Sequence, residues 1–540
     1  MKSKYFRITF LTILVIGSLL LATANLWGVT ETSEARYAEI SREMMRSGDW
    51  VHPSLLNIHH YHKPPITYWL TAISYLTFGV NPFAARFFLV IAYCLQIYLI
   101  FKIAKELLAD EQKAWYASVI YATLPIVLMA VKGLTTDLFM VTSMLAAIYC
   151  WIEFLKIGKY LNLYGFALFL GIGFLTKGPA VFVIPFFSII SFIGVLPKPR
   201  FSLIHYLLAA GVFIVVGLSW FAYLIHNDQN LADYFIYHHL VDRVAHAEVF
   251  ARRSPWYYYL PLFPLVSFPW IIIFFRYLFV KLNAGESSIE LMVKRIVIWW
   301  LLVPLIVYSI SSSKLILYIL PLFTGFSLIT AYYLNLNLGK RMVLNAFVLM
   351  SLLYLGLAGA PFYGHGIYLQ KWLALLPVSA LIISSYFVLK EINYKQVFIK
   401  LSLVFTGTLI IYSAFFLQQN ILLANGISPI TEFIKGKKLI NRPVLVYDKL
   451  LPSLAFELDK DIISIYAGDK SLIREVQFEK DEKWRNSYID LNQQSDKDKL
   501  QQLLSSKVVV VSKKKLLKEM EATMQGWQSK SFGKWTLYYN

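Results

Sequence analysis

The sequence is poor in cysteine and in charge. Its 540 residues include two cysteines, and Asp, Glu, Lys and Arg together make up 15%. Cys94 and Cys150 both lie in apolar segments, which excludes a disulfide framework and a thiolate metal site. Soluble domains have about 25% charged residues, so the low charge excludes an ordinary soluble protein. Long internal repeats are also missing, and with them the inverted-repeat pattern of many secondary transporters.

Hydrophobic residues, in contrast, make up 58% of the chain and aromatic residues 16%. This composition predicts a polytopic membrane protein with Tyr and Trp at the lipid–water interfaces. A bilayer core needs about 20 apolar residues per helix. The sequence contains thirteen candidate segments: 7–27, 84–104, 113–131, 136–154, 161–175, 179–196, 203–225, 258–279, 294–310, 315–334, 342–359, 370–389 and 398–418. The first follows the basic start MKSKYFR, and we interpret it as a transmembrane helix rather than a signal peptide.

We interpret the net charge of +19 as a sign of how the chain is oriented in the membrane, and not as a sign of a nucleic-acid partner. Lys and Arg concentrate in the alternate short loops that are cytoplasmic if the N-terminus is cytoplasmic, as the positive-inside rule requires. This orientation places residues 28–83, residues 226–257 and the tail after about 420 on the outer side. Binding of nucleic acid is not expected, whereas membrane lipids surround the chain.

The tail differs in composition from the rest of the chain. PVLVYD, DIISIY and KVVVVS are typical of short buried strands, and KKKLLKEMEATM is typical of an amphipathic helix. We therefore predict an all-α membrane domain of about thirteen helices over residues 1–419. A soluble α/β domain follows over residues 420–540 on the outer side, and we expect a monomer.

Polar side chains gather at the outer ends of the predicted helices. They come from the two long outer loops and from three short turns: Glu31, Glu34, Arg36, Tyr37, His60, His62, Lys63, Asp137, Lys177, His239 and Lys314. Ionisable groups are costly at membrane depth, so several on one side favour a polar cavity. Carboxylates in it could accept a proton, while Lys and Arg could hold a polyprenyl phosphate whose tail lies in lipid.

Each of these features also has a purely structural interpretation. Residues 30–50 could form an amphipathic interfacial helix with its charges in water. HHYHKPP could be a turn whose two prolines start a helix. Lys177 and Lys314 could be snorkelling cations, whereas Asp137 is too short to snorkel far. The histidines could bind a divalent metal, but the His-x-x-x-His spacing of a helical site is missing.

Several motifs in chain order resemble the membrane glycosyltransferases of GT-C architecture, which include protein O-mannosyltransferases and the lipid A aminoarabinose transferases. They are SEARYAEISREMMRSGDWVHPSL, HYHKPPITYW, TTDLFM, LTKGP, SPWYYYLP and SSSKLILYILP. The resemblance implies an inverting, inner-membrane enzyme that moves a sugar from undecaprenyl phosphate or another polyprenyl phosphate on the periplasmic side. The acceptor would be lipid A, another glycolipid or a protein. No nucleotide sugar and no certain cofactor is implied, although a divalent metal stays open.

Carried over by position, the resemblance also implies roles for the outer residues. The candidate catalytic carboxylates are Glu34, Asp137 and Glu31. Donor-phosphate roles fall to Arg36, Tyr37, Lys63, Lys177 and Lys314, and substrate or metal contacts to His60, His62 and His239. Ser33 stands where the family usually has Asp, so the base stays open among the three carboxylates. His62 stands where the family often has Glu, which leaves the acceptor and any metal contact open.

Two other functions are compatible with these features. A transporter or flippase of an anionic lipid-linked substrate would also need a cationic cavity, but alternating access places binding groups near the membrane midplane. An inactive relative that binds envelope glycans would account for Ser33. For a transferase, we expect Lys63, Lys177 and Arg36 to face one outward cavity, and Asp137 and Glu34 to converge on one site.

Overall fold

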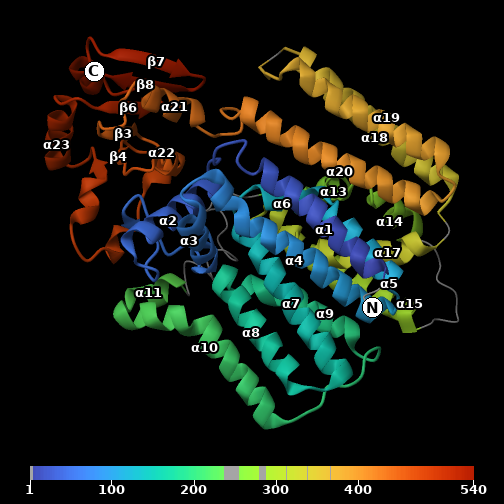
Figure 1. Ribbon diagram of the computed structural model, residues 1–540. Helices are drawn as coiled ribbons and strands as arrows, with labels where there is room; N and C mark the ends of the chain where they lie inside the picture. Colours follow the sequence, from blue (N-terminus) through green and yellow to red (C-terminus); the bar gives the residue numbers. More distant parts are fainter. Residues whose placement is uncertain (1–3, 236–253, 279–287, 312, 337, 365) are drawn as a thin grey trace. The chain divides into compact units, whose positions relative to one another are not determined.

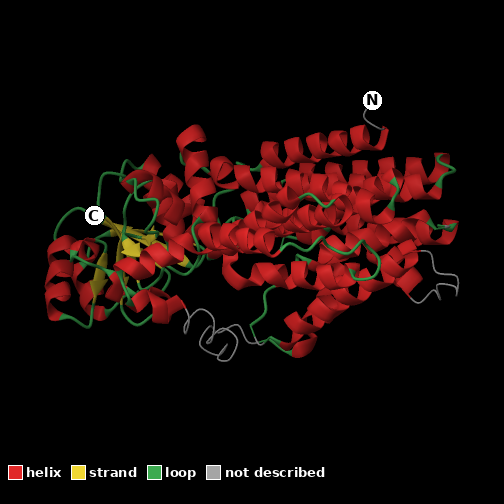
Figure 2. Ribbon diagram, turned by 90° about the horizontal axis from the view of Figure 1, so that it is seen from below, coloured by secondary structure: helices red, strands yellow, loops and turns green. Residues whose placement is uncertain are grey.

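The structure, a computed structural model, describes residues 4–235, 254–278, 288–311, 313–336, 338–364 and 366–540. The chain folds into two compact units. The helical unit comprises Met1–Thr23, Leu89–Lys132 and Thr136–Ser413, and the mixed unit comprises Ala24–Phe88, Gly133–Thr135 and Ala414–Asn540. Every strand of the described residues lies in the mixed unit, and the rest is helix and loop (Figure 2).

By length and composition, nine helical segments of the described residues are able to cross a membrane. They are α1 (Lys4–Thr23), α4 (Pro82–Leu108), α7 (Thr136–Ile157), α10 (Leu203–Asn227) and α20 (Tyr394–Gln419), and the longer segments Tyr160–Phe192, Ser288–Ile310, Lys340–Phe362 and Lys371–Lys390. The longer segments contain α8 (Tyr160–Lys177), α9 (Val183–Phe192), α15 (Ser288–Ile296), α16 (Val303–Ile310), α18 (Lys340–Gly359) and α19 (Leu375–Lys390). The chain is therefore a multi-pass membrane protein, as the sequence predicts.

The predicted number of thirteen helices is not confirmed. Residues 113–131 form α5 (Glu111–Ala122) and α6 (Pro125–Lys132), which are bent by 56° and would make a tenth span if counted together. Residues 258–279 divide into α13 (Tyr259–Ser267) and α14 (Ile271–Leu278), and residues 315–334 keep only α17 (Leu322–Asn335) as α-helix. Each break has a proline beside it, at Pro125, Pro269 and Pro321, and proline removes the backbone donor that would continue a helix.

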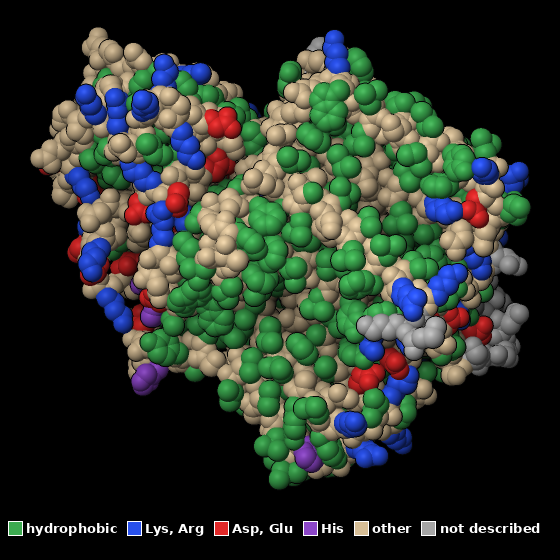
Figure 3. Space-filling view, viewed as in Figure 1, with side chains coloured by type: hydrophobic (Ala, Val, Ile, Leu, Met, Phe, Trp, Pro, Cys, Tyr) green, Lys and Arg blue, Asp and Glu red, His purple; other side chains and the backbone are tan. Residues whose placement is uncertain are grey.

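Small residues let the helices of the helical unit pack closely. Gly171 of α8 faces Gly217 of α10, and a Cβ added at Gly171 would lie 3.2 Å from the Gly217 nitrogen. Gly178 ends α8 with φ of +72°, a conformation that favours glycine, and the 3-10 turn Gly178–Phe182 follows before α9. Apolar side chains cover the outside of α1, among them Phe10, Leu11 and Val15, in keeping with lipid as solvent (Figure 3).

The C-terminal part of the mixed unit is a six-stranded sheet with strand order β5-β4-β3-β6-β8-β7 (Figure 1). The strands are β3 (Val444–Tyr447), β4 (Ile463–Tyr466), β5 (Tyr488–Asp490), β6 (Val509–Ser512), β7 (Gln528–Phe532) and β8 (Trp535–Tyr539). β3, β4, β5 and β6 are parallel, whereas β8 pairs antiparallel with β6 and β7. The connecting helices are α21 (Ser428–Gly436), α22 (Pro452–Leu458), α23 (Gln494–Leu504) and α24 (Lys518–Thr523).

The three strands expected in the tail are present as β3, β4 and β6. The residues of β3 and β6 are buried on both faces, which is the reason that continuous apolar runs predict them. The predicted helix KKKLLKEMEATM is confirmed only in its second half, which forms α24. The mixed unit also includes Ala24–Phe88, and the predicted domain boundary after residue 419 stays a prediction.

The first outer loop folds into α2 (Ser33–Ser47), the short hairpin β1 (Ser54–Leu55) and β2 (Ile58–His59), and α3 (Ile66–Phe78). α2 packs against α3 and α22. Its charged face is buried: Arg42 is 0% exposed, holds Glu39 at 2.8 and 2.7 Å, and reaches Asp461 at 3.3 Å. The charged side chains of Glu39 and Arg42 therefore pair with other protein groups. α2 is thus not an interfacial helix with its charges in water.

Candidate functional site

Both carboxylate oxygens of Glu34 accept hydrogen bonds from other protein groups. Its Oε2 accepts from the backbone N–H and the hydroxyl of Thr30, both at 2.9 Å. Its Oε1 accepts from Arg86 Nε at 2.8 Å and from the Leu134 N–H at 3.4 Å. Arg86 is 1% exposed, donates to the carbonyls of Ala24, Trp27 and Gly28, and stacks 4.1 Å from the Trp27 ring centroid. This arrangement holds the start of α2 in place.

A cavity of about 220 Å³ lies in the mixed unit between the first outer loop and the C-terminal sheet region. Its wall contains four cationic side chains, two carboxylates and two histidines: Arg36, Lys449, Lys470, Arg474, Glu31, Glu475, His60 and His62. Lys449 and Lys470 follow β3 and β4, and Arg36 lies on α2. The lining has an excess of positive charge, so the cavity is suited to an anion.

Glu31 is the carboxylate of this cavity that is best suited to proton transfer. One of its oxygens accepts the N–H of Ser453 at 2.9 Å. Burial raises the pKa of Glu31 to about 7, and the hydrogen bonds from Ser453 and the charge of Arg36 oppose that rise only in part. A carboxyl group whose pKa lies near the working pH can both take up and release a proton.

Two arginines of the cavity are held near each other. The Nε of Arg36 is buried and has no hydrogen-bond partner among the described residues. Arg474 donates to the Leu55 carbonyl at 2.7 Å. Burial lowers the pKa of Arg474 to about 10, the charges of Glu43 and Glu475 oppose this fall, and the charge of Arg36 adds a smaller contribution to it. Like charges that share a buried site are destabilising unless an anion compensates them. The carboxylates of Glu43 and Glu475 supply part of this compensation, and the buried Nε of Arg36 can bind an anion.

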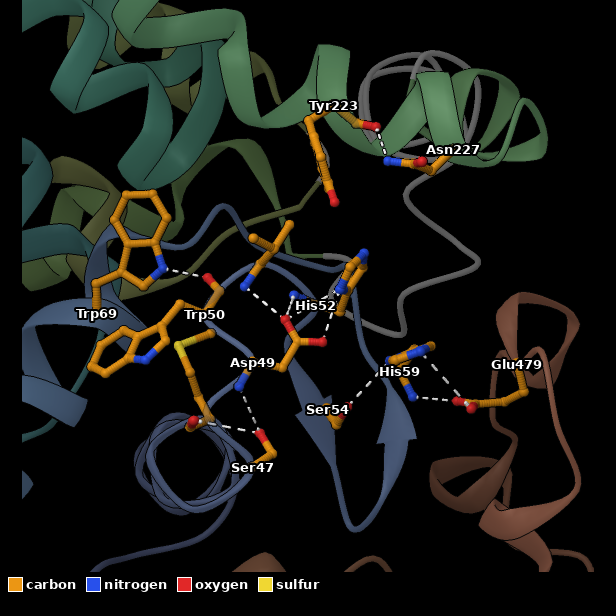
Figure 4. Close-up of polar contacts among 12 residues, drawn as sticks. Ser47, Asp49, Trp50, His52, Ser54, His59, Trp69, Tyr223, Asn227 and Glu479 are labelled. Carbon is orange, nitrogen blue, oxygen red and sulfur yellow. Dashed lines mark hydrogen bonds and ion pairs between the residues drawn. The ribbon is translucent and has the colours of Figure 1, made fainter.

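The histidines of the first outer loop contact carboxylates of the C-terminal part. His62 Nε2 lies 2.8 Å from Glu475 Oε1, and the rings of His60 and His62 are 3.9 Å apart. Figure 4 shows the neighbouring hairpin, where His59 lies between Ser54 and Glu479 and where His52 lies 2.9 Å from Asp49. Burial lowers the pKa of His59.

These histidines do not form a metal site. Among the described residues, no group of three or more His, Cys, Asp and Glu side chains is arranged to hold a metal ion. His239 lies outside the described residues, so its predicted contact stays a prediction. The described residues of the cavity thus do not fit a bound metal.

Asp137 and Lys177 lie together in the helical unit. Asp137 opens α7, Lys177 ends α8, and the two side chains form an ion pair with about a tenth of each exposed. Lys177 Nζ also lies 4.9 Å from the ring centroid of Tyr318. Lys314 is 4% exposed and donates to the carbonyl of Ser254 at 3.0 Å. Both lysines are therefore held by protein groups.

The remaining predicted donor residues lie in the mixed unit. Tyr37 is 9% exposed, and its ring centroid is 5.7 Å from that of Tyr68. Lys63 is half-buried just before the two prolines that precede α3, and it is not part of the cavity wall. The structure thus brings Glu31, Arg36, His60 and His62 together in one cavity, and Asp137 and Lys177 together in an ion pair. The expected convergence of Asp137 with Glu34, and the cavity expected to be shared by Lys63, Lys177 and Arg36, stay predictions.

Sequence reasoning missed the cations that the tail supplies. Lys449, Lys470 and Arg474 are part of no motif, and only their positions after the predicted strands PVLVYD and DIISIY could have singled them out. Arg86 was missed as well, although an arginine at the start of an apolar segment requires a partner.

Residues 62–221 match the family model for dolichyl-phosphate-mannose-protein mannosyltransferase. An undecaprenyl phosphate-alpha-4-amino-4-deoxy-L-arabinose arabinosyl transferase from Pseudomonas fluorescens is 29% identical over 381 residues, 65% of this chain and 66% of the relative. A transferase of the same name from Aeromonas hydrophila is 32% identical over 307 residues, 55% of this chain and 54% of the relative. The chain thus spans about half to two thirds of the length of these curated relatives.

The fold of the chain matches the GT-C fold that the motifs predict. One solved protein whose fold the chain shares is ArnT from Cupriavidus metallidurans. Its structure bound to undecaprenyl phosphate matches with a TM-score of 0.76 and 18% identity, over 100% of this chain and 98% of that one. The structure of ArnT in the apo state matches with a TM-score of 0.75. At this identity the likeness shows the fold.

Proposed function

We propose that the protein is an inverting glycosyltransferase of the inner membrane that takes a sugar from a polyprenyl phosphate, such as undecaprenyl phosphate. The acceptor is lipid A, another glycolipid or a protein on the periplasmic side. The names of the curated relatives and the lipid bound to ArnT support this donor. The observation that carries the proposal is the presence, in one cavity, of a proton-accepting carboxyl group and a buried arginine whose Nε has no partner among the described residues.

Glu31 is the favoured base for this reaction. Glu34 already accepts four hydrogen bonds, and Asp137 is paired with Lys177. Glu31 lines the cavity, accepts hydrogen bonds from Ser453 and forms no ion pair with another described residue. Ser33 stands where the family usually has Asp. In this assignment Glu31, two residues earlier, supplies the carboxylate that Ser33 lacks.

The reaction is a single displacement. Glu31 takes the proton of the acceptor hydroxyl, and the acceptor oxygen bonds to the anomeric carbon from the side opposite the phosphate. The bond from that carbon to the phosphate oxygen breaks, and the polyprenyl phosphate leaves with the electron pair. Arg36, Tyr37, Lys63, Lys177 and Lys314 are the proposed partners of the negative charge on the leaving phosphate.

The membrane orientation is part of the proposal. The N-terminus is cytoplasmic and the C-terminal sheet is periplasmic, because the short loops that carry Lys and Arg then face the cytoplasm. A cysteine introduced at the exposed Ser531 of β7 should react in intact cells with a reagent that crosses the outer but not the inner membrane.

The function is tested with purified protein, a polyprenyl-phosphate sugar and lipid A. We expect release of free polyprenyl phosphate and a glycosidic product, and a loss of both of about 10² to 10⁴-fold in Glu31→Gln. Glu482→Gln is the matched control, because Glu482 is 74% exposed and bonded to its neighbour Arg485 in the same unit. Movement of intact donor across a vesicle membrane without glycosidic product would favour a flippase instead.

A further inference from the structure

The parallel part of the C-terminal sheet has the topology of a ligand-binding α/β sheet. From β3 the chain passes to β4 and then to β5, and afterwards it crosses back to β6 on the other side of β3. The strand order therefore reverses between β3 and β6. In open α/β sheets, ligands bind outside the carboxyl ends of the strands next to such a reversal.

The point of reversal itself is closed by protein groups. Asp448 directly follows β3 and accepts the N–H groups of Ala467 and Asp469 at 2.9 and 2.8 Å. Lys514, which follows β6, reaches Asp448 at 2.7 Å and Asp469 at 3.0 Å. Burial acts to raise the pKa of Asp448, but the hydrogen bonds from Lys514 and from the two backbone groups outweigh it and lower the pKa. These partners leave no place for an anion at that point.

The cavity opens beside this closed point, at the same edge of the sheet. Its C-terminal wall consists of Lys449 and Leu450, which follow β3, and of the segment 470–475, which follows β4. The first outer loop forms the other wall. The volume of about 220 Å³ is several times the roughly 30 Å³ that a water molecule takes up in the liquid, so a phosphate with part of a sugar fits.

The charges of the C-terminal wall exceed what their protein partners balance. Glu475 is bonded to His62, and Lys449 has Asp469 as its nearest carboxylate, at 3.7 Å. Lys470 is exposed toward solvent and forms no ion pair with another described residue. Arg474 donates to backbone carbonyls, so within the described part of the chain its positive charge has no carboxylate at bonding distance.

We propose that Lys449, Lys470 and Arg474 bind an anionic group of the acceptor, a phosphate or a carboxylate, and so select acceptors that have negative charge near the attacking hydroxyl. The assignment rests on the proposed function, and it gives the C-terminal sheet a role in substrate selection. It separates the two anions of the reaction, because the acceptor anion is bound by the C-terminal wall and the carrier phosphate by other cations of the chain. Glu31 then lies in the same cavity as the acceptor hydroxyl.

The kinetic test uses the double variant Lys449→Gln/Lys470→Gln, since Arg474 also holds the hairpin and its loss would disturb folding. Lys480→Gln/Lys483→Gln is the matched control, because both lysines lie in the same unit and do not line the cavity. With lipid A as acceptor, we expect the KM for lipid A to rise about 10-fold or more in the first variant, with the KM for the donor unchanged. With dephosphorylated lipid A as acceptor, the two double variants should have the same KM for the acceptor. A rise in the donor KM instead would make this a carrier-phosphate site and would overturn the assignment.

A binding test separates this inference from the proposed function. Inorganic phosphate is titrated into the full-length protein in detergent, and its Kd is measured by calorimetry for the wild type and both double variants. We expect the Kd to rise about 10-fold or more only in Lys449→Gln/Lys470→Gln. An equal Kd in all three proteins would overturn the inference. The two proposals can fail separately. If only this variant loses phosphate binding and the wild type forms no glycosidic product, the anion site is supported and the transferase function is refuted.

Discussion

Glu34→Gln should destabilise the mixed unit rather than remove a catalytic base. Glu34 and Arg86 are 4% and 1% exposed, and Arg86 Nε lies 2.8 Å from Glu34 Oε1. Removing one partner of a buried ion pair costs about 3–5 kcal/mol, because the other charge stays buried without compensation. Glutamine keeps the shape of the side chain and one acceptor oxygen, so we expect a loss of about 3 kcal/mol in the free energy of unfolding.

Thermal unfolding of the purified protein measures this loss. In a unit of about 150–250 residues, 1 kcal/mol corresponds to roughly 2–4 °C in Tm, so the variant should unfold about 6–12 °C lower. Glu482→Gln is the control, because an exposed ion pair contributes at most about 1 kcal/mol.

The same variant also distinguishes the two roles that the sequence left open. If Glu34 is structural, the Tm falls, and the turnover of the protein that stays folded is largely kept at low temperature. If Glu34→Gln leaves the Tm unchanged and lowers turnover by about 10²-fold or more, Glu34 is the base. That result would refute the structural interpretation of its four hydrogen bonds.

Three further predictions concern the reaction. Because burial raises the pKa of Glu31 to about 7, turnover should rise with pH through about 7 as this base loses its proton, and a pH–rate profile of Glu31→Gln should lack that limb. Asp137→Asn removes the carboxylate that holds Lys177, so turnover in a steady-state assay should fall, but by less than in Glu31→Gln, and unchanged turnover would exclude a role for the pair. Lys63→Ala should raise the donor KM much more than it lowers the Tm, whereas equal loss of expression and activity would indicate a structural role.

Local sequence patterns predict those parts of the molecule that a single segment determines. The apolar runs of α1, α4 and α20 identify membrane helices, and the buried runs of β3, β4 and β6 identify strands. β7 is not visible in this way, because its residues are polar and largely exposed at the edge of the sheet. The family motifs place Glu34, Arg36 and Lys63 in one loop, but they do not state which side chains are already paired.

The contacts that decide roles join residues far apart in the chain. Glu34 is bonded to Arg86, 52 residues away, and Glu31 to Ser453, 422 residues away. Neither spacing follows from periodicity or from a motif. The same is true of His62 and Glu475, which close the wall of the cavity. For this reason, the sequence identifies the loop that contains the base, whereas the tertiary contacts distinguish Glu31 from Glu34.

The stoichiometry of one reaction tests the transferase most directly. Purified protein is incubated with a polyprenyl-phosphate sugar labelled in the sugar and with lipid A, and both products are quantified by mass spectrometry. We predict one free polyprenyl phosphate for each labelled sugar on the acceptor, with the configuration at the anomeric carbon inverted, and about 10² to 10⁴-fold less of both products with Glu31→Gln. Intact donor after many hours with folded wild-type protein, or a product of retained configuration, would contradict the proposed reaction.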